Sequence, residues 1–205
     1  MSNVRVKKRN GSIEPMNLEK MHVMVDRACK DIAGVSASQV EMQSGIQFYD
    51  GITTDEIQEI LIKSASDLIS LDQPNYQFVA ARLLLFSIRK SLYGKIFEIP
   101  SLLDHIQRCV ESGVYDPAVN DKFSAEEIQE IGKFLDHDRD LLFTYAGLRQ
   151  VADKYLVQDR SSGQVYETPQ FMYMLIAMTM FAEYPAETRL NYICLLYTSP
   201  SPRDY

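Results

Sequence analysis

Apolar residues recur at helical spacing along most of the chain, and the sequence therefore predicts a mainly α-helical protein. In the first half, this spacing predicts four helices, over residues 18–32, 36–49, 53–68 and 74–93. In the second half, it predicts helices over residues 99–113, 124–135 and 145–154, and a methionine-rich helix from residue 168.

The predicted helices begin and end with residues that favour such positions. Asn17 precedes the first helix as an N-cap, and Thr168-Pro169 places a cap and a proline at the start of the methionine-rich helix. We expect Gly34 to end the first helix. Three further starts have the sequence form of a capping box, at Ser36, Thr53 and Ser124.

Two β-hairpins are predicted. Residues 4–6 and 12–16 flank Asn10-Gly11, a dipeptide that favours a tight turn between strands. Residues 155–160 and 164–167 flank a Ser-Ser-Gly turn in the same way.

The predicted fold class is thus mainly α, in two units. Residues 1–95 form a β-hairpin lid on a four-helix bundle, and residues 96–194 form a second helical unit with one β-hairpin. Residues 195–205 have a different composition, with two prolines among serines, and predict a disordered or foreign tail.

The composition is that of a globular chain with unevenly placed charge. Hydrophobic residues make up 46% of the 205 residues and charged residues 24%, which excludes disordered and fibrous classes. The net charge is −7: residues 1–95 carry 12 Lys and Arg against 11 Asp and Glu, whereas residues 96–205 carry 9 against 17. This acidity argues against a nucleic-acid partner, because counterion release needs a broad positive face.

Neither the apolar segments nor the cysteines indicate a membrane or secreted protein. The apolar run at residues 171–182 is shorter than the roughly 20 residues that span a bilayer. The N-terminal sequence MSNVRVKKRN has no apolar stretch, so we expect no signal peptide. The three cysteines form no Cys-x-x-Cys pair, which argues against a zinc ribbon or a disulfide framework and favours the cytoplasm.

Polar residues of the first unit converge on a candidate anion site. Lys8 and Arg9 precede the turn of the first hairpin and Glu14 follows it. Asn17 stands at a helix N-terminus, with Lys20 one turn further on. Free backbone N–H groups and the helix dipole favour an anion at such an end.

Two further groups complete this candidate site. Thr53 and Thr54 form a second helix N-terminus, and Arg89 and Lys90 lie on the last turn of the fourth helix. Cations, helix N-termini and a carboxylate that accepts from an exocyclic amine are what a nucleotide site needs. The alternative is that the cations are solvated surface charges and that Asn17 and the two threonines are simply caps.

The residues themselves carry a family resemblance. VKKRNGSIEPMNLEK at residues 6–20 closely resembles the signature of the ATP-cone domain, a regulatory module of many ribonucleotide reductase large subunits. The resemblance continues through FYDGITT (48–54), AARL (80–83), FLDHDRD (134–140), KYLVQDR (154–160) and FAEYPAETR (181–189). Over about residues 4–193 the chain therefore resembles the alpha subunit of the class I aerobic enzyme.

This resemblance implies an ATP-cone over residues 1–95 that binds ATP or dATP, with Mg²⁺, as an allosteric switch. It implies that the triphosphate meets Lys8, Arg9 and Lys90. It implies that Glu14 and Asn17 contact the adenine, with Lys20 nearby.

The resemblance also implies a set of lining residues. Thr54, Ile57 and Gln58 would lie along the sugar and phosphates. This chain has Gln58 where a close bacterial relative is expected to carry histidine. The glutamine amide can donate a hydrogen bond, but unlike histidine it cannot take a charge. Further lining positions are Val6, Pro15, Met16, Leu18 and Glu19.

The chemistry of the family is expected to lie elsewhere. The resemblance implies that ribonucleoside diphosphates are reduced by a thiyl radical and a cysteine pair further along the polypeptide, with the radical cofactor in a partner beta subunit. We therefore expect no catalytic residue here, and as partners the beta subunit and other alpha subunits. Cys29 and Cys109 are predicted core residues, and Cys194 has no assignment.

Two alternatives to this function are kept open. A cone-containing transcriptional repressor would need a zinc ribbon, and no paired Cys-x-x-Cys motif is present. A helical interaction module whose cone has lost its nucleotide is the other, because of Gln58.

The remaining polar candidates are interpreted as structural. Residues 136–138, Asp-His-Asp, do not share a helix face, so we expect a solvated helix end and no metal site. His22 and His105 are expected to be structural. Core packing is expected for Met172, Met174, Met178 and Met180.

Overall fold

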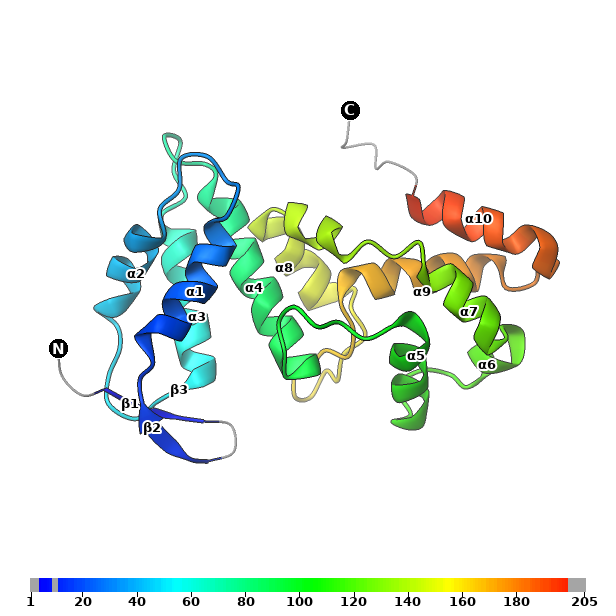
Figure 1. Ribbon diagram of the computed structural model, residues 1–205, viewed down its shortest axis with the longest axis horizontal. Helices are drawn as coiled ribbons and strands as arrows, with labels where there is room; N and C mark the ends of the chain where they lie inside the picture. Colours follow the sequence, from blue (N-terminus) through cyan, green and yellow to red (C-terminus); the bar gives the residue numbers. More distant parts are fainter. Residues whose placement is uncertain (1–3, 9–10, 199–205) are drawn as a thin grey trace. The chain divides into compact units, whose positions relative to one another are not determined.

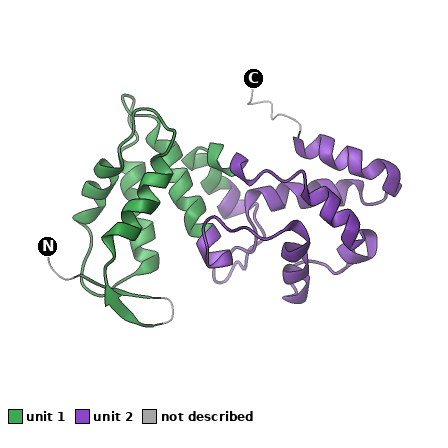
Figure 2. Cartoon of the chain, in the orientation of Figure 1, with its two compact units in different colours: residues 1–88, 140–150 green, residues 89–139, 151–205 purple. Residues whose placement is uncertain are grey.

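The computed structural model describes residues 4–8 and 11–198, and it divides into two compact units (Figure 2). Among these residues, unit 1 comprises those up to Ile88 and residues 140–150, and unit 2 comprises residues 89–139 and 151–198. The division into units falls after Ile88 and adds residues 140–150 to the first unit, whereas the domain boundary expected at residue 95 stays a prediction. Arg9 of the candidate site and residues 199–205 of the expected tail lie outside the described residues.

The secondary structure is mainly helical, as predicted (Figure 1). The strands are β1 (Arg5–Lys7), β2 (Ile13–Pro15) and β3 (Ile52–Thr53). The helices of the first half are α1 (Leu18–Cys29), α2 (Ala37–Gly45), α3 (Thr54–Asp67) and α4 (Tyr76–Tyr93). Those that follow are α5 (Leu102–Glu111), α6 (Ala118–Lys122), α7 (Ala125–Gly132), the 3₁₀ helix η1 (His137–Leu142), α8 (Tyr145–Lys154), α9 (Pro169–Phe181) and α10 (Ala186–Thr198).

The three strands form one small sheet in the order β2-β1-β3. β1 and β2 make the predicted antiparallel hairpin, with Val6 opposite Glu14. β3 was not predicted: it pairs parallel to β1, with Val6 opposite Ile52. A two-residue strand carries no periodic pattern, so only its long-range pairing reveals it.

Helix α4 forms much of the core of unit 1, because it is apolar on nearly every side. Its fully buried side chains include Tyr76, Val79, Ala80 and Leu85. Arg82 on the same helix donates to the backbone carbonyls of Ala28 (3.3 Å) and Lys30 (2.6 Å).

These two hydrogen bonds explain why α1 ends before the expected residue 32. They satisfy carbonyls that a helix C-terminus leaves open, and Asp31 then takes a left-handed conformation (φ 59°). The chain therefore leaves the helix at Cys29, and Gly34 (φ 74°) belongs to the following turn rather than to the helix end.

Helix α2 is shorter than the predicted 36–49, and its capping box does not form. Ser36 is the N-cap, but its side chain makes no capping hydrogen bond. The Gln39 side-chain oxygen instead accepts a hydrogen bond from the hydroxyl of buried Tyr76, which also accepts from the Ser36 backbone N–H (2.9 Å). A tertiary partner thus replaces the local one.

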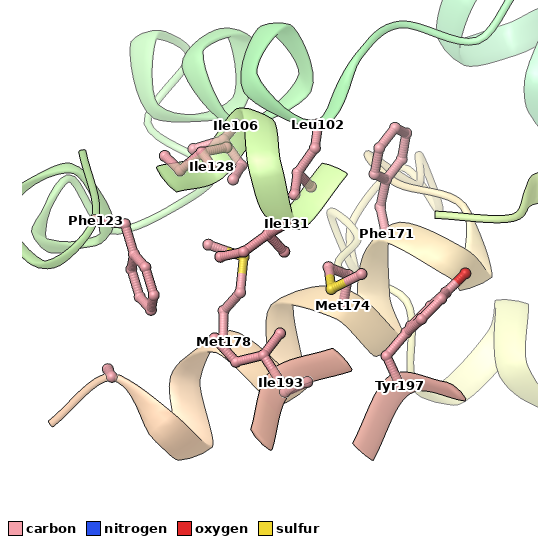
Figure 3. Close-up of a cluster of buried hydrophobic side chains, with 12 residues drawn as sticks. Leu102, Ile106, Phe123, Ile128, Ile131, Phe171, Met174, Met178, Ile193 and Tyr197 are labelled. Carbon is pink, nitrogen blue, oxygen red and sulfur yellow. The ribbon is translucent and has the colours of Figure 1, made fainter. Parts of the chain in front are cut away.

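The core of unit 2 joins four helices (Figure 3). Figure 3 shows side chains of α5, α7, α9 and α10 converging, and the cluster includes Phe171, Met174 and Met178. Met172 is also buried, so three of the four methionines pack as predicted. The prediction is wrong for Met180, which is 61% exposed.

A buried ion pair replaces the capping box predicted at Ser124. Ser124 does cap α7, because its hydroxyl accepts from the Glu127 backbone N–H (3.2 Å). The Glu127 carboxylate, however, pairs with both nitrogens of the Arg189 fork at 2.5 Å. That guanidinium also lies over the Phe123 ring, 4.3 Å from its centroid.

The second predicted hairpin is present but short: one antiparallel bridge joins Gln158 and Val165, and two cross-strand backbone hydrogen bonds of 2.8 and 2.9 Å flank it. A buried carboxylate also holds this segment. Glu167 accepts from the Val157 backbone N–H (2.8 Å) and from the Tyr115 hydroxyl (2.5 Å). The same hydroxyl lies 2.9 Å from Nε2 of His105.

The solvated helix end expected at residues 136–138 is confirmed for Asp136 and Asp138, which are exposed at the start of η1, but not for His137. His137 is half-buried with its ring edge against Phe171, at a centroid distance of 4.8 Å. His105 is fully buried and stacks on the same ring at 3.9 Å, which confirms its structural role. Within residues 4–8 and 11–198, no group of three His, Cys, Asp or Glu side chains could hold a metal ion.

The last helix extends past the expected domain end. Residues 195–198 continue α10 rather than beginning a tail, and Tyr197 packs into the unit 2 core. None of the helices in the described part of the chain is both long enough and apolar enough to cross a bilayer.

We expect the protein to lose stability as the pH falls from about 6.5 toward 4. Burial lowers the pKa of His105 to about 3 and that of His137 to about 4, whereas the unfolded chain protonates both near 6.5. The unfolded state then binds more protons than the folded state. Each neutral histidine therefore contributes stability that declines by about 1.4 kcal/mol per pH unit over this interval. Urea unfolding between pH 4 and 7.5 measures this slope.

The control uses the third histidine. His137→Asn should flatten the slope by about half, since one of the two titrating groups is removed. His22→Asn should not flatten it, because the pair with Glu41 raises the pKa of exposed His22. Glu167, whose pKa burial raises, opposes the trend equally in all variants. An unchanged slope in His137→Asn would contradict the prediction.

Candidate functional site

The candidate site begins with one face of the β1–β2 hairpin (Figure 1). Val6 is 4% exposed, so its face of the hairpin packs onto the helices. Side chains alternate along a strand, which puts Lys8 on the same face as Val6, and Glu14 shares it as the cross-strand partner of Val6. Lys8 Nζ lies 3.5 Å from a Glu14 carboxylate oxygen. Three predicted site residues thus share one face.

The start of α1 follows directly from β2. Asn17 is its N-cap, and its side-chain oxygen accepts from the Lys20 backbone N–H at 2.9 Å. The structure therefore confirms the capping role of Asn17. Because residues three and four apart share a helix face, Asn17, Lys20 and Met24 lie along one side of α1.

The start of α3 is held against the other edge of β1. Lys7 pairs with Thr53, so the next residues along the two parallel chains are Lys8 and Thr54. Thr53 forms the predicted capping box: its hydroxyl accepts from the Glu56 N–H (3.1 Å), and the Glu56 carboxylate accepts from the Thr53 N–H (2.8 Å). The hairpin is thus flanked by two helix N-termini, each of which favours negative charge.

Gln58, on the second turn of α3, is a buried amide whose hydrogen bonding is incomplete. It is 5% exposed, and its amide nitrogen lies 3.7 Å from the Met24 sulfur on α1. Its side-chain oxygen is buried without a hydrogen-bond partner. A buried acceptor of this kind costs stability unless a donor reaches it. Ile57, beside it, is partly buried.

Two of the predicted site residues stay predictions. Lys90 lies in the last turn of α4 beyond Ile88, in the segment that belongs to unit 2. Its part in the site stays a prediction. Arg9, as stated above, is not among the described residues.

Four predicted lining residues border a different hollow, on another side of α1. A groove of about 980 Å³ lies between α1 and α2. His22 on α1 bridges to Glu41 on α2 within it, with 2.7 Å between Nδ1 and the carboxylate oxygen. The groove is bordered by the predicted residues Pro15, Met16, Leu18 and Glu19 and by others that sequence reasoning missed, among them Met21, Met42 and Ile46.

A sequence signal for this groove existed but was ambiguous. Met42 is 68% exposed and Ile46 is 82% exposed, and the two lie four residues apart. Residues at this spacing share a helix face, which sequence reasoning assigns to the core by default. Only the ending of α2 at Gly45 and its packing on α1 show that the pair faces the groove.

We expect Gln58→Leu to raise the free energy of unfolding by about 1 kcal/mol, because it removes a buried acceptor that has no partner. Gln43→Leu is the matched control: Gln43 is exposed on α2, so its replacement should change stability by less than about 0.5 kcal/mol. Urea unfolding of both variants measures the difference. A loss of stability in Gln58→Leu would show that the amide oxygen has a partner.

Comparison with known proteins gives two domain matches. Residues 4–91 match the ATP cone domain, and residues 141–203 match the all-alpha domain of ribonucleotide reductase. The first match contains every predicted site residue, and the second covers much of the later helical region.

Named relatives agree with these matches. The chain is 49% identical over 199 residues to ribonucleoside-diphosphate reductase 1 subunit alpha of Escherichia coli, which covers 97% of this chain and 26% of the relative. It is 46% identical over 196 residues to the alpha subunit of Haemophilus influenzae (96% and 26%), and 41% identical over 206 residues to that of Enterobacteria phage T4 (100% and 27%). The chain thus spans about a quarter of the length of these relatives.

Proposed function

Because this chain belongs to the family of ribonucleoside-diphosphate reductase alpha subunits and carries an ATP cone, we propose that it binds ATP or dATP as an allosteric effector. The conversion of ribonucleoside diphosphates to deoxyribonucleoside diphosphates is then the work of the whole reductase. The chain contributes regulation through a coupling free energy between the effector site and the rest of the enzyme.

The observation that carries this proposal is the face shared by Lys8 and Glu14. It places a cation and a carboxylate 3.5 Å apart, on the packed side of a hairpin whose edges hold two helix N-termini. A nucleotide presents the matching groups, since its phosphates need cations and N–H donors and its exocyclic amine needs an acceptor.

The roles follow from this placement. Lys8 and the start of α3 at Thr54 would meet the phosphates, with Arg9 and Lys90 as further cations. Glu14 would accept from the adenine amine, with the start of α1 beside it. Gln58 offers the unpartnered acceptor for a sugar hydroxyl, and it carries no charge with which to sense the effector.

The other components belong to the complete enzyme. Mg²⁺ would arrive with the triphosphate, because this ion is usually held through phosphate oxygens. The radical cofactor would belong to a beta subunit, which together with other alpha subunits would be the partner of the full-length protein. The three free cysteines favour the reducing cytoplasm as the location.

We predict that this chain binds ATP and dATP, and that Lys8→Ala weakens triphosphate binding by about 1.5–3 kcal/mol, the value of a charge-assisted hydrogen bond. Lys90→Ala should weaken binding by a similar amount. Isothermal titration calorimetry with each nucleotide measures these affinities. Lys7→Ala is the matched control, because strand alternation puts the Lys7 side chain on the opposite face of β1 from Lys8.

The outcomes separate the possibilities. A folded chain with no affinity for either nucleotide would refute the proposal and leave a helical module that has lost its ligand. Equal affinity in the wild type, Lys8→Ala and Lys90→Ala would remove both lysines from the site. Equal losses in Lys7→Ala and Lys8→Ala would mean that net charge, rather than position, determines binding.

We predict that the chain alone does not reduce ribonucleoside diphosphates. Burial raises the pKa of the Cys29 thiol to about 11 and also raises that of Cys109, so both stay protonated at neutral pH and are poor nucleophiles. Incubation with a ribonucleoside diphosphate and a dithiol, followed by chromatography, checks this. Formation of a deoxyribonucleotide would overturn it.

A further inference from the structure

One exposed residue pair ties the hairpin to the segment that leads into α3. The Arg5 backbone N–H donates to the Asp50 carboxylate at 2.9 Å. The Arg5 guanidinium donates to both oxygens of the same carboxylate, from Nε at 3.1 Å and from Nη2 at 2.6 Å. The Gly51 N–H in turn donates to the Arg5 carbonyl at 2.8 Å. Four hydrogen bonds therefore join Arg5 to two consecutive residues.

This tie lies at the beginning of the β1–β3 pairing, which is very short. Only two residue pairs make up that ladder, Val6 with Ile52 and Lys7 with Thr53. A slip of one residue along a strand turns every side chain to the other face. The Arg5–Asp50 contacts fix the pair immediately before the ladder and so determine which residue of β1 lies beside the start of α3.

The segment after Asp50 is fixed at its other end. Tyr49 donates from its hydroxyl to Glu56 (2.8 Å), and the second oxygen of that carboxylate accepts from Thr53. Residues 49–56 are therefore closed on themselves by side chains. These contacts do not fix the position of residues 49–56 along β1. Among the contacts described for this segment, the Arg5–Asp50 pair is the one that joins it to β1 through a guanidinium and a carboxylate.

The Arg5–Asp50 pair is too exposed to solvent to contribute much to the free energy of folding. The side chains of Arg5 and Asp50 are 63% and 51% exposed. Exposed ion pairs add little to the free energy of folding, even though a bidentate fork has strict geometry. The Arg5 guanidinium holds the pKa of Asp50 at about 2, so the pair stays charged at neutral pH. Its effect is on position.

We infer that Arg5 and Asp50 are positioning residues of the nucleotide site: by fixing the register of β1 on β3, they hold Lys8 beside the N-terminus of α3, where a triphosphate binds. This inference rests on the proposed function. The Arg5–Asp50 pair then affects mainly the affinity for the phosphates. It has little effect on the contacts to the adenine, because Glu14 and Asn17 connect to β1 through β2, at the other edge of the sheet.

The test is Arg5→Ala in the 205-residue chain, with ATP and AMP titrated calorimetrically. ATP affinity should fall about tenfold, roughly the value of one charge-assisted contact, while AMP affinity changes far less. Arg5→Lys keeps the charge without the fork and should recover part of the ATP affinity. The melting temperature should stay close to that of the wild type.

Lys133→Ala is the matched control. Lys133 forms an ion pair with Glu130 at 2.6 Å, and the two side chains are exposed to similar extents, 66% and 56%, but the pair lies on α7 in unit 2. Its loss should leave the affinity for both nucleotides unchanged.

Each outcome decides. Wild-type ATP binding with unchanged affinity in Arg5→Ala overturns the inference and leaves the proposed function standing. Equal losses for ATP and AMP that follow a lowered melting temperature also overturn it, because they indicate a purely structural role. A wild-type chain that binds neither nucleotide removes the proposed function and this inference together.

Discussion

The parallel pairing of β3 with β1 is the constraint on which the candidate site depends. It joins residues 46 positions apart in sequence, and so it must offset the entropy of closing a long loop with only two residue pairs. Burial of Val6 and Ile52 contributes the apolar part of that free energy. Because β2 leads into α1 and β3 into α3, this pairing brings the N-terminus of α3 to the hairpin that already leads into α1.

Elsewhere in the chain, single polar side chains hold in place segments that have no regular secondary structure to hold them. Arg82 closes the end of α1, Tyr76 draws Gln39 away from the start of α2, and Glu167 holds the segment after α8. Each forms hydrogen bonds to groups distant in sequence that no local secondary structure pairs. The irregular parts of the fold are therefore specified by a few long-range hydrogen bonds.

Gln58 is one of several exceptions to this rule, and it lies at the candidate site. A buried oxygen without a partner lowers the stability of the free protein, and such local costs are expected where a ligand completes the hydrogen bonding. Met24, which contacts Gln58, lies on α1, and another side of α1 borders the groove between α1 and α2. Helix α1 therefore borders two surfaces of unit 1, the candidate site and the groove.

The helical class, the first hairpin and the caps at Asn17 and Thr53 can all be predicted from the residues, because they depend on spacing and on neighbours within one turn. The sequence also places Lys8 and Glu14 on opposite arms of that hairpin, but the 3.5 Å contact between them is seen only in the structure. Three features depend on tertiary contacts: β3 exists, Gln39 and Glu127 bond to Tyr76 and Arg189 instead of to their local caps, and Pro15 and Met16 border a groove. These outcomes depend on residues distant in sequence, whose competition with local partners no periodic pattern records.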